Sequence, residues 1–156
     1  MQIRRFKSAD LEQILELFYD TVHTVNAKDY HLVQLEAWAP KTPDRSRWMN
    51  SLKENISYAA EINGKIIGFG DFNNEAYLDK LFTHKDYQGK GVASKILNTL
   101  EQEAMKLGCK EIYTEASITA RPFFENKGYT CLNRQNKKHN GQVFINYIMR
   151  KTLYTE

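Results

Sequence analysis

The sequence predicts a single domain of mixed α-helices and β-strands over residues 1–156. Two Asn-Gly pairs, at 63–64 and 140–141, lie between apolar runs and predict β-hairpins, because a type I′ turn needs positive φ at both central residues. Between them, apolar residues at helical spacing separate two strand-like runs, which predicts a parallel crossover. The expected order is β-α-α-β-β-β-α-β-α-β-β.

The N-terminal elements are a strand, a helix and an irregular helical insert. Residues 3–6 form a short strand, and residues 8–22 carry apolar side chains at spacings of three and four, typical of an amphipathic helix. From 21 to 48 the pattern loosens around Pro40 and Pro43, with a short helix predicted near 32–38. Thr42 before Pro43 also suits a helix start.

The later elements follow in close succession. Strands are predicted at 56–62, 65–72 and 76–83, then a glycine-led helix that Gly108 ends. A strand at 111–117, a brief helix ended by Gly128, and a hairpin of strands 129–134 and 142–150 complete the chain.

Composition excludes several classes of protein. A net charge of +3 is too small to indicate a nucleic-acid partner. No segment approaches the roughly 18 apolar residues of a membrane span, and the start MQIRRFKSADLEQ is polar where a signal peptide needs an apolar region. Cys109 and Cys131 have no metal or redox spacing. We therefore expect a cytoplasmic protein with no metal and no membrane partner.

The stretch DYQGKGVASKIL, residues 86–97, places two glycines directly before a helix. The N-terminus of a helix presents unpaired N–H groups and a partial positive charge, so this arrangement predicts an anion site. It is not a P-loop, since Lys95 is followed by Ile96, and it is not a dinucleotide fingerprint, since Ser94 occupies the third glycine position. A tight turn without a ligand remains the alternative.

The motif around this turn resembles the acyl-CoA-binding motif of the GNAT superfamily of N-acetyltransferases. That signature is Gln or Arg, two residues, Gly, one residue, then Gly or Ala, matched here by Gln88, Gly91 and Ala93. The stretch EASITARPFFENKGY, residues 115–129, is similar to the strand and short helix that follow in the family. The segment 18–40 further resembles the YafP-like branch.

The resemblance implies a GNAT-like central mixed β-sheet flanked by helices, with acetyl-CoA as co-substrate. Two parallel strands would splay, and the pantetheine arm would bond to the main chain of Leu81 and Thr83 in the gap. Lys85, Lys90 and Lys95 either contact phosphates or are simply solvated. The implied cofactor-binding residues are Leu81, Phe82, Thr83, Gln88, Gly89, Lys90, Gly91, Val92, Ala93, Ser94, Ser117, Phe123 and Phe124.

The implied reaction is attack of a neutral amine on the acetyl thioester, so a base is needed to deprotonate an ammonium group of pKa about 10.4. Asp79 is the candidate base and, on an alternating strand, shares a face with Leu81; a structural aspartate is the alternative. Phe124 stands where the family usually has a tyrosine acid. Tyr30 and His23, in the insert, are the substitutes, with packing or capping as their alternative roles.

These observations favour an acetyl-CoA-dependent N-acetyltransferase acting on a primary amine of a small molecule or protein. Phe124 motivates the alternative, a non-catalytic acyl-CoA-binding sensor, and a structural domain that binds no nucleotide is the third hypothesis. Trp38 and Trp48 either wall the acceptor pocket or anchor the core. The amine acceptor is not indicated, and a homodimer is compatible with the sequence.

Overall fold

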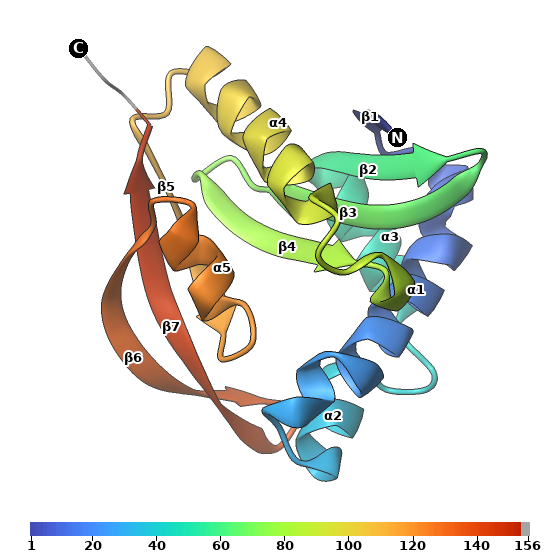
Figure 1. Cartoon of the computed structure of the whole chain (residues 1–156). Helices are drawn as coiled ribbons and strands as arrows, with labels where there is room; N and C mark the ends of the chain where they lie inside the picture. The colour runs from blue at the N-terminus through green and yellow to red at the C-terminus, as the bar shows by residue number, and fades with distance from the viewer. Residues whose placement is uncertain (154–156) are drawn as a thin grey trace.

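The computed structural model describes residues 1–153, which form a seven-stranded sheet with helices on both faces (Figure 1). All neighbouring strands are antiparallel except β4 and β5, which are parallel. The predicted fold class, a mixed sheet flanked by helices, is confirmed. The strands, in their order across the sheet, are β1 (Gln2–Arg5), β2 (Ile56–Ile62), β3 (Lys65–Phe72), β4 (Tyr77–Thr83), β5 (Glu111–Ser117), β7 (Gln142–Thr152) and β6 (Thr130–His139).

Both predicted Asn-Gly hairpins are present. Asn63 and Gly64 have φ of 50° and 82°, and Asn140 and Gly141 have φ of 47° and 81°. Positive φ at both central residues matches the twist of the flanking strands, so each turn sets the register of its hairpin.

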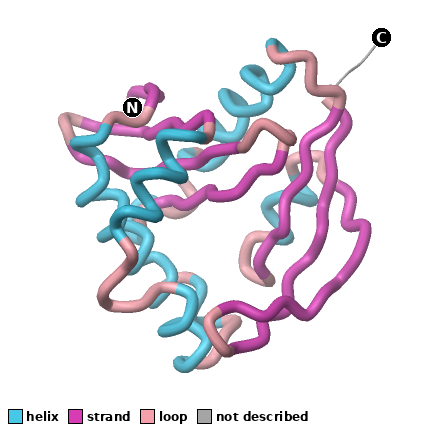
Figure 2. Tube along the Cα trace, turned by 180° about the vertical axis from the view of Figure 1, so that it is seen from behind, coloured by secondary structure: helices cyan, strands magenta, loops and turns pink. Residues whose placement is uncertain are grey.

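The helices divide between the two faces of the sheet. On one face lie α1 (Leu11–Thr24), α2 (Leu32–Trp38) and α3 (Arg45–Glu54), and on the other lie α4 (Val92–Lys106) and α5 (Arg121–Asn126). Figure 2 shows from behind that α1 and α3 lie over the β1–β4 half of the sheet, whereas α2 lies beside the turn of the β6–β7 hairpin. Each face has its own apolar cluster, one around Ile96 and Leu100 of α4 and the other around Phe18 and Phe69.

The structure adds one helix to the predicted order. Three helices, not two, precede β2, and α3 begins after Asp44, whose carboxylate accepts the N–H of Arg47 at 3.1 Å. The predicted start at Thr42 and Pro43 is therefore wrong, because Asp44 is the residue that caps the helix. The first helix also runs to Thr24, so His23 lies in its last turn and not in the irregular insert.

Strands β4 and β5 separate soon after they meet. They pair only at Tyr77 with Tyr113 and at Leu78 with Thr114, so the ends of the two strands diverge. The sheet is thereby divided into a half made of β1 to β4 and a half made of β5, β7 and β6. This is the splay that the resemblance implies.

Helix α4 packs directly on the backbone of β3. A Cβ at Gly68 would lie 2.7 Å from Val92 Cγ1 and 2.9 Å from Ile96 Cδ1, distances that real Cβ atoms do not reach. A Cβ at Gly70 would meet Ile96 Cγ2 at 3.2 Å. The absence of a side chain at Gly68 and at Gly70 therefore sets how close α4 comes to the sheet.

Candidate active site

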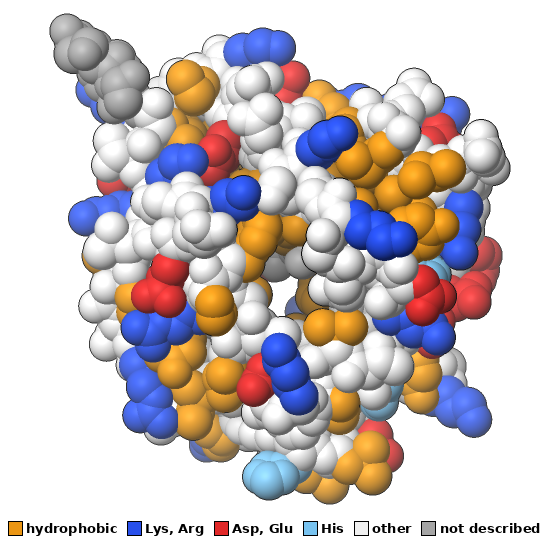
Figure 3. Space-filling model, in the orientation of Figure 1, with side chains coloured by type: hydrophobic (Ala, Val, Ile, Leu, Met, Phe, Trp, Pro, Cys, Tyr) orange, Lys and Arg blue, Asp and Glu red, His pale blue; other side chains and the backbone are white. Residues whose placement is uncertain are grey.

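A cleft of about 1300 Å³ lies in the region where β4 and β5 diverge, and Figure 3 shows a hollow at the centre of the molecule. Its walls come from α1, α3, β4, β5, the start of α5 and the tip of the β6–β7 hairpin. Of the predicted catalytic residues, Asp79 and Tyr30 line it and His23 does not. The predicted cofactor-binding residues in its wall are Leu81, Phe82, Thr83, Gln88, Ala93, Ser117, Phe123 and Phe124.

The peptide groups of Leu81 and Thr83 point into the gap. The N–H of His84 donates to the carbonyl of Ile67 at 2.9 Å, and hydrogen-bonded residues alternate along an antiparallel pair. Leu81 and Thr83 therefore face away from β3, toward β5, which is no longer paired at that level.

The carbonyl of Thr83 is already satisfied. It accepts the Thr21 hydroxyl at 2.9 Å and the Gln88 side-chain amide at 2.8 Å. Two donors use both lone pairs of a carbonyl oxygen. Leu81 is thus the residue of this strand best placed to offer its peptide groups to a ligand in the gap.

A β-bulge interrupts β4 at Asp79. Asp71 pairs with Lys80 and Phe72 pairs with Leu78, which leaves Asp79 with no residue opposite. The regular alternation expected through Asp79 is therefore wrong, because the extra residue changes the phase of the strand. The Asp79 carboxylate lies in the cleft wall and accepts Lys80 Nζ at 2.8 Å, with 38% of its side chain exposed.

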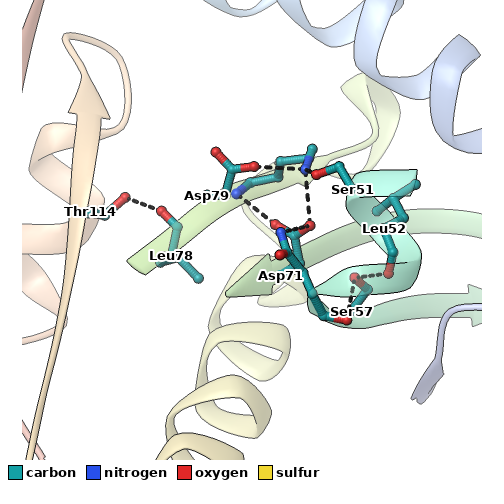
Figure 4. Close-up of polar contacts among 9 residues, drawn as sticks. Ser51, Leu52, Ser57, Asp71, Leu78, Asp79 and Thr114 are labelled. Carbon is teal, nitrogen blue, oxygen red and sulfur yellow. Dashed lines mark hydrogen bonds and ion pairs between the residues drawn. The ribbon is translucent and has the colours of Figure 1, made fainter. Parts of the chain in front are cut away.

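Behind Asp79 lies a buried cluster that the sequence analysis missed (Figure 4). Asp71, with 0% exposure, accepts the backbone N–H of Lys80 at 3.0 Å, Lys80 Nζ at 3.0 Å and Asn55 Nδ2 at 3.1 Å. Lys80 Nζ also donates to Ser51 Oγ at 2.8 Å. Burial raises the pKa of Asp71, although Lys80 opposes the shift. Burial lowers the pKa of Lys80, but the charges of Asp71 and Asp79 outweigh this effect and raise the pKa above its usual value.

The glycine turn before α4 has the geometry of an anion site. Gly89 and Gly91 have φ of 71° and 81°, the left-handed region that favours glycine. The first intrahelical bond runs from the N–H of Lys95 to the carbonyl of Gly91 at 3.1 Å, so the N–H groups of residues 92–94 have no acceptor within the helix. A Cβ at either glycine would meet nothing within 4 Å, so the space beside the turn is open.

The three lysines near this turn are exposed. Among the ion pairs found over residues 1–153, none involves Lys85, Lys90 or Lys95. Lys90 Nζ lies 5.5 Å from the centre of the Tyr87 ring. Their charges are therefore available to an anion at the turn.

Tyr30 and His23 are both engaged in structural contacts. The Tyr30 hydroxyl donates to the carbonyl of Ile145 at 2.9 Å and accepts the N–H of Ile118 at 2.9 Å, which ties the insert to β7 and to the end of β5. Burial raises the pKa of Tyr30. His23 Nε2 lies 2.8 Å from the carbonyl of Ala39, and its ring stacks on Tyr19.

Phe124 is buried at 4% exposure, with its ring edge against Tyr129. Trp38 and Trp48 line the cleft and pack on Phe18, so they are at once part of its wall and part of the aromatic core. The two alternatives expected for these tryptophans are therefore not exclusive.

Two further cleft residues were missed, Tyr77 and Glu115. Burial raises the pKa of Tyr77, with the nearby charge of Glu115 as the second cause. Glu115 also pairs with Lys137 Nζ at 2.8 Å. In the sequence, Ile112 and Ala116 alternate with Glu111 and Glu115 along the predicted strand, a signal that could have placed Glu115 on the more exposed face of β5.

Over residues 1–153, no group of three His, Cys, Asp or Glu side chains is arranged to hold a metal ion. In the same part of the chain, no helix is long and apolar enough to cross a membrane.

The chain is similar to known acetyltransferases. The family model for the acetyltransferase (GNAT) domain matches residues 26–152. An uncharacterized N-acetyltransferase, YafP, from Escherichia coli (strain K12) is 34% identical over 150 residues, covering 96% of this chain and 95% of its own.

Solved structures share the fold. A GCN5-related N-acetyltransferase from Rhodopseudomonas palustris has a TM-score of 0.94 at 27% identity, covering 97% of this chain and 94% of its own. The PaiA N-acetyltransferase from Thermoplasma acidophilum, solved with coenzyme A, has a TM-score of 0.80 at 18% identity, covering 97% and 98%.

Proposed function

Because the chain belongs to the GNAT family of N-acetyltransferases, we propose that it uses residues 1–156 as one domain to transfer the acetyl group of acetyl-CoA to a primary amine of a small molecule or protein. One observation carries the proposal: β4 and β5 separate and leave the peptide groups of Leu81 facing a cleft, beside the glycine turn of α4. The structure of PaiA with coenzyme A supports the choice of ligand.

The cofactor would follow the gap between the strands. Its diphosphate accepts the N–H groups of residues 92–94, where Gly89 and Gly91 leave the approach open. Its pantetheine arm donates a hydrogen bond to the carbonyl of Leu81, since the carbonyl of Thr83 already accepts two donors. The exposed lysines near the turn neutralise the phosphates.

The acceptor amine must lose a proton before it attacks, because an alkylammonium has a pKa of about 10.4. Asp79, in the cleft wall, takes that proton directly or through water. The amine nitrogen then bonds to the thioester carbon, and the N–H of Leu81 stabilises the oxyanion. The nitrogen, now cationic, gives up its second proton to water, the C–S bond breaks as the carbonyl reforms, and the acetamide and the CoA thiolate are released.

The leaving sulfur has two routes, because Phe124 cannot donate a proton. The thiolate leaves unaided, which an ordinary thiol pKa of about 8.5 permits, or Tyr30 donates its phenolic proton after giving up its bond to Ile145. Tyr30→Phe distinguishes them: the first route keeps kcat, and the second lowers kcat while leaving the KM for acetyl-CoA unchanged.

The first test is calorimetric titration with acetyl-CoA. Gly91→Glu would strain the left-handed backbone, so the sharper pair is Gly91→Asp and Gly91→Asn, two residues of nearly equal shape that both tolerate positive φ and both cap helices. We expect the aspartate to weaken binding at least about tenfold more than the asparagine, through repulsion of the diphosphate.

Equal affinities for the two variants would contradict the phosphate site, and no binding by the unmodified protein would contradict the proposed function. Amine-dependent release of free thiol, lost in Asp79→Asn, then separates the enzyme from the acyl-CoA sensor. The sensor is the reading that the buried Phe124 favours.

A further inference from the structure

In the β-bulge of β4, a side chain from β3 accepts a backbone N–H that has no partner in the regular ladder. At this rung the backbone N–H of Lys80 faces β3 and donates to Asp71 Oδ1 at 3.0 Å. A bulge disturbs the ladder where the extra residue sits, so its conformation depends on what satisfies the displaced peptide groups. Here Asp71 supplies the acceptor.

The second carboxylate oxygen of Asp71 accepts hydrogen bonds from two side chains. Oδ2 accepts Lys80 Nζ and Asn55 Nδ2, and Asn55 is the residue that ends α3. A fully buried carboxylate costs free energy unless every lone pair is used, and an apolar side chain would avoid that cost. Asp71 therefore fastens α3, β3 and the bulge to one point (Figure 4).

The residues on either side of Lys80 are the two that the proposed reaction needs. Asp79 precedes it, with its carboxylate held by Lys80 Nζ at 2.8 Å in the cleft wall. Leu81 follows it, with its peptide groups turned into the gap. One network thus sets the direction of both the base and the oxyanion donor.

We propose that Asp71 is a positioning residue for acetyl transfer: through Lys80 it holds the bulge that aims the Asp79 carboxylate and the Leu81 N–H at the thioester. The inference rests on the proposed function for the identity of the ligand, and on the contacts of Asp71 for the mechanism. Neither Asp71 nor Lys80 needs to touch the substrate.

The first arm of the test uses the ligand-free protein. Amide hydrogen exchange of Lys80 is measured by NMR relative to Phe82, which pairs with Phe69 in the same ladder. We expect the Lys80 amide to be protected in the unmodified protein and to exchange at least about tenfold faster, relative to Phe82, in Asp71→Ala. Ser57→Ala is the matched control, since its buried hydroxyl bonds to Leu52 close by without touching β4.

The second arm adds acetyl-CoA or CoA to the same samples. The Leu81 amide resonance should respond more to acetyl-CoA than to CoA in the unmodified protein and in Ser57→Ala, because only acetyl-CoA carries the thioester carbonyl. In Asp71→Ala this difference should be lost. Asp71→Asn keeps a side-chain oxygen that can accept the Lys80 N–H, so this variant should retain the difference.

The outcomes separate the two proposals. A Leu81 response that survives in Asp71→Ala overturns the positioning role, as does an unprotected Lys80 amide in the unmodified protein, a result that needs no variant to fold. No response to acetyl-CoA in the unmodified protein overturns the proposed function instead, and Lys80 exchange then still reports whether Asp71 holds the bulge.

Discussion

Two buried clusters, on opposite faces of the sheet, each join an acid to a lysine. In the cleft cluster, Asp71 accepts Lys80 and Asn55. In the rear cluster, Glu101 of α4, at 8% exposure, accepts the Tyr129 hydroxyl at 2.7 Å and Lys151 Nζ at 2.9 Å. In each cluster one acid accepts a lysine and one further side-chain donor.

They differ in what the acid holds. Within residues 1–153, the Glu101 carboxylate accepts only side-chain donors, which tie α4 to the residue before β6 and to β7. Asp71 bonds also to the backbone N–H of Lys80, inside the strand that lines the cleft. The same chemistry therefore fastens elements together in one place and sets the conformation of a strand in the other. Substitutions in the rear cluster should change stability alone.

Asp71→Ala should have the largest effect on stability. It leaves the N–H and Nζ of Lys80 and the Asn55 amide without their buried acceptor, so we expect a loss of about 3–5 kcal/mol in the free energy of unfolding. Urea denaturation followed by circular dichroism measures it. A loss below about 1 kcal/mol would show that the cluster is loosely held.

Glu101→Gln should cost less, about 1–2 kcal/mol, because the glutamine oxygen can still accept one of the two donors. Affinity for acetyl-CoA should not change, since Glu101 is not among the residues that line the cleft. Calorimetric titration beside urea denaturation tests both halves. A change in acetyl-CoA affinity in Glu101→Gln would remove the distinction between the clusters.

Tyr129→Phe should change how the stability of the rear cluster depends on pH. Burial, and then Glu101, raise the pKa of Tyr129 above its usual value of about 10. The stabilisation linked to this proton is thus present below about pH 10 and is lost as pH rises toward the folded pKa. Tyr129→Phe should lose about 1 kcal/mol near pH 7, and its difference from the unmodified protein should shrink above about pH 10. Denaturation at a series of pH values measures this, and a constant difference would contradict it.

Lys151→Met should have the smallest effect. Its side chain is 29% exposed, so its pair with Glu101 is partly screened by solvent, and we expect a loss of about 1 kcal/mol or less. The loss should diminish further at high salt. A larger loss of stability in thermal melts, unaffected by salt, would contradict this. It would show that the Lys151 pair is shielded from solvent like that of Lys80, whose side chain is only 12% exposed.

Features fixed by neighbouring residues could be predicted from the sequence. The Asn-Gly hairpins, α4 and the strand before it follow from local turn chemistry and periodicity. The motif of Gln88, Gly91 and Ala93 indicated the anion site, and the structure gives that turn open space and unpaired N–H groups.

Features fixed by contacts between distant residues could not be predicted. Asp71 and Lys80 meet only because β3 and β4 pair in one register with a bulge, and nothing in either strand alone indicates an extra residue at Asp79. Likewise, the Tyr30 hydroxyl meets carbonyl and N–H groups about 90 to 115 residues away, so its engagement could not be read from the insert.

The short junction between β4 and β5 also affects the stiffness of the sheet. Only two residue pairs join the backbones of the two half-sheets, so this seam is the most compliant line across the sheet. A ligand that bonds to Leu81 on one side and packs against β5 on the other would act as additional rungs across the seam. The complex with the ligand would then be stiffer than the chain alone.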